Sequence, residues 1–256
     1  MHVTSKAFWL PKAGNAPEEY EDAFWPDKPF EAHTKLVRFA VADGATETSF
    51  SSIWARGLTR AYGRGRLGDR SRGKAIARLR AAWHRRVNGK PLPWYAEEKV
   101  RMGAFSSLVG LTLTVRPSID RRHGQWEAMA LGDSCLFHVR GVDLLAAFPL
   151  DGSEQFNNRP LLLSTNPDSD DSVLGQMAHK QGQWEATDVF YLMTDALACW
   201  LLRRQEENAK GLARLAELQT QDRFAEFVHR EREELDANGR PRLQNDDVTL
   251  VRIEVS

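Results

Sequence analysis

The pattern of apolar and polar positions in the first part of the chain predicts a strand followed by two helices. Residues 36–42 form an apolar, β-branched run that ends in Asp43-Gly44, which is typical of a strand that stops at a turn. Apolar residues then recur at helical spacing over 46–62 and again over 76–83. The sequence therefore predicts a strand, a sharp turn and two amphipathic helices in succession.

The other segments also alternate between strand and helix patterns. Apolar stretches broken by polar turns predict an antiparallel series of strands in the middle of the chain. The segment 149–183, rich in Pro, Asp, Asn, Ser and Gly, is interpreted as a surface excursion that could act as a flap. We further expect a short strand, an irregular loop and a second edge within 1–35, a helix over 94–102, strands over 106–116, 126–131, 135–139 and 188–194, a helix from 197 with two more up to 235, and a strand over 248–255.

Composition indicates one folded domain, expected over 1–256. With 42% hydrophobic and 27% charged residues, the 256-residue chain can bury a large core and lacks the bias of a disordered protein. It shows no signal-peptide pattern and no run of the roughly 20 apolar residues that cross a bilayer, so we expect a cytoplasmic protein without a membrane partner. Cys135 and Cys199 lie in apolar runs without metal-ligand spacing, which favours buried thiols in a reducing compartment.

The net charge gives no argument for a particular partner, although charge is unevenly distributed. Lys plus Arg and Asp plus Glu number 35 each. Residues 56–86 are densely basic, with Asp69 as the single acid among them. Because these basic residues fall on the polar faces of the two predicted helices, a solvated helix face is favoured over a surface for an acidic or phosphorylated partner. Nucleic acid is not expected as a partner.

Four aspartates stand at the ends of predicted strands: Asp43, Asp133, Asp195 and Asp246. Taken singly, such an aspartate usually caps a helix or a turn. Gathered at one side of a sheet, the four would repel one another unless hard cations neutralised them, and oxygen-only ligands suit Mg²⁺ or Mn²⁺. Two such ions could lower the pKa of a bridging water and stabilise an in-line phosphoryl displacement. Asp247 is an alternative to its neighbour Asp246.

Five short motifs carry a resemblance to a known family. VADGATE, LGDSCLF, YLMTDALA and NDDVTLV occur in the order and spacing of the signature segments of the protein phosphatase 2C family, and an upstream EDAF completes the set. The resemblance spans about 21–255. The chain thus resembles metal-dependent serine/threonine phosphatases of the bacterial type. This resemblance implies an α+β fold of four layers, αββα, in which a central antiparallel β-sandwich is flanked by helices.

The resemblance also implies a first group of metal ligands. Asp43 looks like the aspartate that bridges two metals, and the backbone carbonyl of Gly44 would join it. Asp195 and Asp246 match the other carboxylates of the first metal. Asp133 resembles the residue that, with Asp195, holds a weaker third ion. The implied cofactors are therefore two Mn²⁺ or Mg²⁺ ions with an optional third.

The resemblance also implies that the EDAF motif supplies the acidic residues at the second metal ion. Glu21 resembles its ligand, with the nearby Glu18 and Glu19 as alternatives. Asp22 would not bind the metal directly but would orient the water bound to it. Asp22 and Asp43 are therefore the expected catalytic residues.

Three positions depart from the family pattern. Ala45 stands where some members have a histidine proposed as general acid, and Ala196 replaces a usual glycine. The arginine that usually grips the phosphate is not evident, and Lys12 is a conceivable substitute. These departures bear on catalytic efficiency more than on the metal site.

The leading hypothesis is a serine/threonine protein phosphatase that hydrolyses phosphomonoesters with a metal-bridged hydroxide. Its expected partners are a phosphorylated protein substrate and, as a candidate, a cognate kinase. The first alternative is a catalytically weak phosphatase-like domain that binds a phosphoprotein or a regulatory partner. The second is a metal-dependent phosphodiesterase or nuclease served by the basic helices, for which steep salt dependence of nucleic-acid binding would be the sign.

Overall fold

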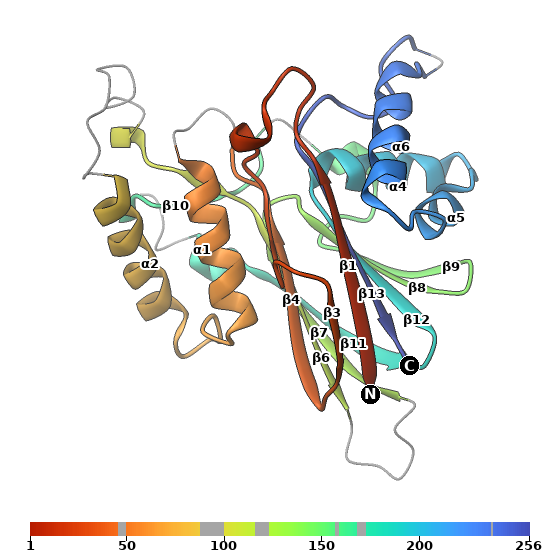
Figure 1. The fold of residues 1–256 in the computed structure, drawn as a ribbon. Helices are drawn as coiled ribbons and strands as arrows, with labels where there is room; N and C mark the ends of the chain where they lie inside the picture. Colours follow the sequence, from red (N-terminus) through yellow and green to blue (C-terminus); the bar gives the residue numbers. More distant parts are fainter. Residues whose placement is uncertain (46–49, 88–99, 116–122, 157–158, 168–172, 237) are drawn as a thin grey trace.

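The computed structural model describes residues 1–45, 50–87, 100–115, 123–156, 159–167, 173–236 and 238–256. Two antiparallel sheets face each other in the middle of the molecule, and helices cover both outer faces (Figure 1). The expected α+β fold, with four layers in the order αββα, is therefore confirmed.

The first sheet has the strand order β3-β1-β13-β12-β8-β9. The register places Val3 opposite Val255, so the first and last strands pair and the two chain ends lie close together (Figure 1). Met193 lies opposite Leu250, which brings the end of one strand beside the start of the next along the sheet. The strands are β1 (His2–Leu10), β3 (Phe30–His33), β8 (Cys135–Arg140), β9 (Asp143–Phe148), β12 (Asp188–Met193) and β13 (Val248–Val255).

The second sheet has the order β11-β7-β6-β4-β2. Ala23 pairs with Ala42 and Leu108 with Leu131. The first residues of β2 and β6 therefore lie at the same end of the sheet as the last residues of β4 and β7. The strands are β2 (Ala23–Trp25), β4 (Leu36–Ala42), β6 (Leu108–Val115), β7 (His123–Leu131) and β11 (Ala178–Glu185), and a separate pair joins β5 (Phe105–Ser106) to β10 (Leu163–Ser164).

Helices are amphipathic and bury their apolar faces against the sheets. Trp54 and Leu58 of α1 (Ser51–Gly63) belong to the core under the second sheet, where α2 (Arg72–Val87) packs beside α1. The first sheet is covered by α4 (Asp195–Glu206), α5 (Gly211–Ala216) and α6 (Gln221–Glu233). Short 3-10 turns are η1 (Pro17–Glu19), η2 (Ser153–Gln155) and η4 (Leu174–Gln176). None of the described helices is long and apolar enough to cross a membrane.

A third apolar cluster fills the space between the two sheets. Phe39 and Leu111 reach into it from the second sheet, and Phe190 and Ile253 from the first, all fully buried. These residues occupy alternate strand positions, as expected when one face of each strand meets the partner sheet. The sandwich holds the strand ends at fixed positions.

Several predicted elements differ from those observed. The helix expected over 46–62 begins at Ser51, because Phe50 adopts a left-handed conformation (φ 63°), and residues 46–49 lie outside the described part. The helix expected over 94–102 also falls mostly outside it. Strand β9 was not predicted, since its half-exposed residues lack a clean alternation.

The surface excursion expected over 149–183 is partly wrong. Residues 178–183 belong to the edge strand β11, whose side chains are mostly exposed and therefore polar. Leu163 is fully buried, and Val173 and Met177 are nearly so, so this segment also contributes to the core under the second sheet. Its possible role as a flap stays a prediction.

Candidate functional site

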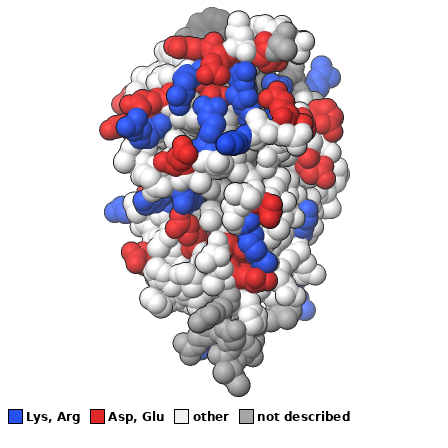
Figure 2. All heavy atoms as spheres, turned by 90° about the vertical axis from the view of Figure 1, so that its right-hand side faces the viewer, with Lys and Arg blue, Asp and Glu red and all other residues white. Residues whose placement is uncertain are grey.

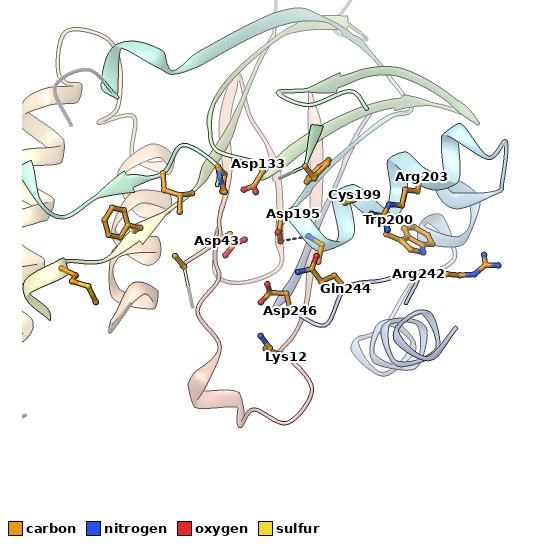
Figure 3. Close-up of a pocket in the computed structure, with 17 residues that line it drawn as sticks. Lys12, Asp43, Asp133, Asp195, Cys199, Trp200, Arg203, Arg242, Gln244 and Asp246 are labelled. Carbon is orange, nitrogen blue, oxygen red and sulfur yellow. Dashed lines mark hydrogen bonds between the residues drawn. The ribbon is translucent and has the colours of Figure 1, made fainter. Parts of the chain in front are cut away.

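A pocket of about 790 Å³ opens where the strand ends meet. Asp43 follows β4, Asp133 follows β7, Asp195 follows β12, and Asp246 precedes β13, and all four line the pocket. Figure 3 shows the carboxylates of Asp43, Asp133 and Asp195 turned towards a common space. The fold thus brings together four acidic residues that are up to 203 positions apart in the sequence.

Two buried serines join the loops that carry Asp43 and Asp133. The backbone N–H of Asp43 donates to Ser107 Oγ (3.2 Å), and the N–H of Ser107 donates to the Asp43 carbonyl (2.9 Å). The hydroxyls of Ser107 and Ser134 are hydrogen-bonded at 2.6 Å. Ser134 therefore has a structural partner, and these contacts fix the distance between the two loops.

The turn after Asp43 requires a residue without a side chain. A Cβ added at Gly44 would lie 2.7 Å from the Glu21 carbonyl oxygen and 3.0 Å from Ser51 Cβ. Gly44 therefore allows the backbone of the EDAF motif and the start of α1 to approach the Asp43 loop closely.

Glu21 and Asp22 lie beside this loop, but neither lines the pocket. The Glu21 carboxylate accepts a hydrogen bond from the Ser51 hydroxyl at the start of α1. Asp22 is 1% exposed, and its Oδ2 accepts a hydrogen bond from Thr249 Oγ1 at 2.7 Å. Its Oδ1 has no hydrogen-bond partner among the described residues, so a buried acceptor remains available behind the pocket.

The adjacent carboxylates of Asp246 and Asp247 have different surroundings. Asp246 lines the pocket, whereas Asp247 is buried and accepts hydrogen bonds from the backbone N–H groups of Lys12 (2.8 Å) and Glu21 (2.6 Å). Asp247 thereby ties the N-terminal loop to the start of β13. The structure favours Asp246 over Asp247 as the residue available to a ligand.

Burial and mutual repulsion raise the pKa values of the pocket carboxylates. Burial, together with the charge of Asp246, raises the pKa of Asp133 to about 6. Burial and then the charges of Asp133 and Asp246 raise the pKa of Asp195 to about 7. The pKa of Asp43 is also raised well above its ordinary value, by burial first and by Asp22 and Asp195 next. Such a cluster favours the binding of cations or protons.

Other residues complete the pocket wall. Ala45 and Ala196 line it at the two positions that depart from the family pattern, and Lys12 lies near Asp246 (Figure 3). Sequence reasoning missed Arg203 and Arg242, which also line the pocket. Arg203 could have been found, because it lies eight residues after Asp195 in one helix and so shares its face.

The two cysteines are both unpaired thiols. Cys135 is fully buried, as predicted, and burial raises its pKa. Cys199 is only partly buried and lines the pocket, so the prediction of a buried thiol is wrong in part for this residue.

Comparison with known protein structures shows the same fold in several phosphatases. The photosystem II phosphatase PBCP matches with 13% identity, a TM-score of 0.57 and 99% coverage of both chains. RsbX in complex with magnesium matches with 16% identity, a TM-score of 0.53, and 100% and 96% coverage of this chain and that one. The catalytic domain of the serine/threonine phosphatase PstP in complex with two manganese ions matches with 15% identity, a TM-score of 0.51, and 99% and 98% coverage.

Sequence comparison gives the family. A search of curated proteins found no match. The family model of protein phosphatase 2C matches residues 20–245, which include the motifs EDAF, VADGATE, LGDSCLF and YLMTDALA but end at the first residue of NDDVTLV, just before Asp246. Because this match covers most of the chain and the fold agrees with it, the chain belongs to the protein phosphatase 2C family.

Proposed function

We propose that this chain is a Mn²⁺- or Mg²⁺-dependent phosphatase that hydrolyses phosphoserine and phosphothreonine in proteins. The observation that carries the proposal is the convergence of Asp43, Asp133, Asp195 and Asp246 on one pocket. Family membership supports phosphomonoester hydrolysis, and the magnesium in RsbX and the two manganese ions in PstP support the choice of metal. A phosphorylated protein is therefore the proposed substrate, and a cognate kinase a candidate partner.

The donor set of the pocket fits hard divalent cations. Its carboxylates provide oxygen ligands only, and burial with mutual repulsion makes their ionised forms costly until positive charge arrives. Among the described residues, no group of three His, Cys, Asp or Glu side chains is already arranged to hold an ion. The proposed ligands are Asp43, the carbonyl of Gly44, Asp195 and Asp246 for the first ion, Glu21 for the second, and Asp133 with Asp195 for a third.

The proposed ions would supply Lewis-acid activation of water and of the phosphoryl oxygens. To contribute as a ligand, Glu21 would have to release the Ser51 hydroxyl to which its carboxylate is bonded. Asp22, with one free buried oxygen, can accept a hydrogen bond from a water held in front of it.

The chain's own residues also limit how the phosphate is handled. Ala45 carries no proton to donate, so the leaving oxygen would take its proton from solvent in the open pocket. Lys12 lines the pocket and offers a positive charge to the phosphoryl group in place of the absent arginine.

A direct test uses p-nitrophenyl phosphate and a phosphothreonine peptide, with Mn²⁺ or with EDTA. We expect turnover only with the metal, and its loss in Asp43→Asn and in Asp195→Asn. Asp143→Asn is the matched control, because Asp143 is an exposed aspartate at the start of β9 that does not line the pocket. Metal-independent turnover that survives in both pocket variants would contradict the proposal.

A second candidate function is a weakly active domain that binds a phosphoprotein or a regulator. Ala45 and Ala196 at the pocket wall favour it, because neither side chain can donate a proton or grip a phosphate. Calorimetry distinguishes the two functions. A binding module would bind a phosphopeptide without turnover, and its affinity would tolerate Asp43→Asn and Asp195→Asn.

A further inference from the structure

One face of helix α4 runs along the pocket wall from the aspartates to an arginine. Asp195, Cys199 and Arg203 are four residues apart in turn, and all three line the pocket, as does Trp200. With a rise of 1.5 Å per residue, the eight steps from Asp195 to Arg203 span about 12 Å along the helix axis. The pocket therefore has an acidic end and a distant basic end.

Arg203 and Arg242 form this basic end. In Figure 3 they lie beside Trp200, to one side of the four aspartates. The side chain of Arg203 is exposed and makes no hydrogen bond or ion pair with the described residues, whereas its backbone carbonyl accepts the N–H of Glu207 (3.0 Å). Arg242 Nε lies 3.5 Å from Glu234 Oε2 and donates to the Leu235 carbonyl (3.4 Å), while its two terminal nitrogens make no hydrogen bond or ion pair with the described residues.

Nearby acidic side chains engage these two arginines only in part: Arg242 pairs with Glu234, and the pKa of Asp236 is lowered by the backbone N–H of Arg240 first and also by the charge of Arg203. Figure 2 shows basic and acidic side chains mixed over the α4–α6 side of the molecule. Asp236 and Glu207 line the adjoining small groove, but Asp236 Oδ1 accepts the backbone N–H groups of Asn238 (2.8 Å) and Arg240 (2.9 Å). Glu207 is ion-paired to Arg204 at 3.4 Å.

The other arginines nearby are already used. Arg204 and Arg214 are ion-paired to the buried carboxylate of Glu231, at 3.0 Å and 2.5 Å. Arg203, although it is the sequence neighbour of Arg204, points instead to the pocket. The contrast suggests that Arg203 serves a ligand rather than the packing of the helices.

We propose that Arg203 and Arg242 form a subsite for an acidic side chain of the substrate, so that this phosphatase prefers phosphopeptides with a Glu or Asp at a fixed distance from the phosphoresidue. This inference rests on the proposed function, because the phosphoryl group must occupy the aspartate end. An extended peptide advances about 3.3 Å per residue, so about 12 Å corresponds to three or four residues. The preferred acid should lie at that separation, on one side of the phosphoresidue.

The test uses phosphothreonine peptides that carry a single Glu, or Gln in its place, at each position from one to six residues on either side. In the wild-type protein with Mn²⁺, we expect kcat/KM to be about fivefold higher for the Glu peptide than for the Gln peptide when this residue lies three or four positions from the phosphothreonine on one side. At the other positions the two peptides should have about equal kcat/KM. That size is the upper range for an exposed charge pair. The preference should fall in high salt.

Two substitutions assign the preference to the arginines. Arg203→Gln with Arg242→Gln should bring the Glu-to-Gln ratio to about one at the preferred position. Arg223→Gln is the matched control, because Arg223 is an exposed arginine of α6 that pairs with Glu226 outside the pocket, and it should keep the ratio. A ratio that is unchanged in the double variant, or that is the same at all positions, would overturn the subsite.

A binding measurement separates this inference from the proposed function. Fluorescence anisotropy with the wild-type protein, Mn²⁺ and labelled peptides that carry a non-hydrolysable phosphonate in place of the phosphate should show the same roughly fivefold preference in Kd, lost with Arg203→Gln and Arg242→Gln. If p-nitrophenyl phosphate is hydrolysed but no preference appears in either assay, the subsite is wrong and the phosphatase function stands. If nothing is hydrolysed but the preference appears in Kd, the subsite stands and the phosphatase function is wrong.

Discussion

At the scale of single residues, the turn at Gly44 sets how closely three segments approach the pocket. A Cβ there would lie 2.7 Å from a backbone oxygen, which cannot move away as a flexible side chain could. We expect Gly44→Ala to lower the free energy of unfolding by about 1–3 kcal/mol, the usual cost of overpacking, and to reduce Mn²⁺-dependent turnover by displacing Asp43. Urea titration and a phosphatase assay measure the two effects.

Gly73→Ala provides the control for this prediction. Gly73 lies in α2 with nothing within 4 Å of an added Cβ, so alanine should leave stability unchanged or raise it by up to about 1 kcal/mol. Equal stability of Gly44→Ala and the wild-type protein would show that the Asp43 loop can move aside.

At the scale of elements, one buried carboxylate links the three helices that cover the first sheet. Glu231 of α6 accepts a hydrogen bond from Trp200 Nε1 of α4 at 2.7 Å and pairs with Arg204 of α4 and Arg214 of α5. Burial raises the pKa of Glu231, but these partners outweigh it and the pKa is lowered overall. The carboxylate is therefore ionised at neutral pH and is a strong constraint on α4.

We expect Glu231→Gln to lower the free energy of unfolding by about 3–5 kcal/mol, because it leaves two guanidinium groups without their counter-charge. Hydrogen exchange should accelerate first in α5 and α6, while α1 keeps its protection. Glu226→Gln removes an exposed ion pair of the same helix and should cost under about 1 kcal/mol. Similar losses of unfolding free energy in Glu231→Gln and Glu226→Gln would contradict the role of Glu231 as the buried link between the three helices.

Elements with a clear apolar pattern could be predicted from the sequence, and half-exposed elements could not. The apolar runs 36–42 and 248–255 coincide with β4 and β13. Strands β9 and β11 lie at sheet edges with many exposed residues, so their composition resembles that of loops. The order of the two sheets depends on pairings between distant segments, which periodicity does not encode.

In the candidate site, too, some residues could be predicted from the sequence and others could not. Aspartates at strand ends could be recognised because a strand stop is a local signal. The basic end of the pocket could not, because Arg242 reaches it from a loop whose position depends on the packing of α6 and β13. Likewise, the separate surroundings of Asp246 and Asp247 follow from contacts with residues 12 and 21, more than 220 positions away.

At the scale of the whole molecule, the sandwich stabilises the fold while it holds several carboxylates in mutual repulsion. The folded-state pKa of Asp195 is about 7, whereas an unfolded aspartate has a pKa of about 3.9. Because the folded pKa is raised, protonated Asp195 contributes stability that is fully present below about pH 4 and is lost as pH rises to about 7. His138, whose pKa burial lowers, acts in the opposite direction as pH falls through about 6.5.

We therefore expect the metal-free protein to lose stability through Asp195 between about pH 4 and pH 7, with no further loss from this residue above that range. Urea titrations of the wild-type protein and of Asp195→Asn in EDTA isolate the effect, because His138 contributes equally to both and cancels in the difference. At pH 7.5, Mn²⁺ at about 100 times its Kd should stabilise the wild-type protein by about 2.7 kcal/mol and the variant by less. At pH 5 protons compete with the metal, so the gain should shrink. Parallel pH curves for the two proteins would show that the pKa of Asp195 is not raised in the folded protein. No stabilisation by Mn²⁺ at pH 7.5 would show that the pocket carboxylates do not bind the ion.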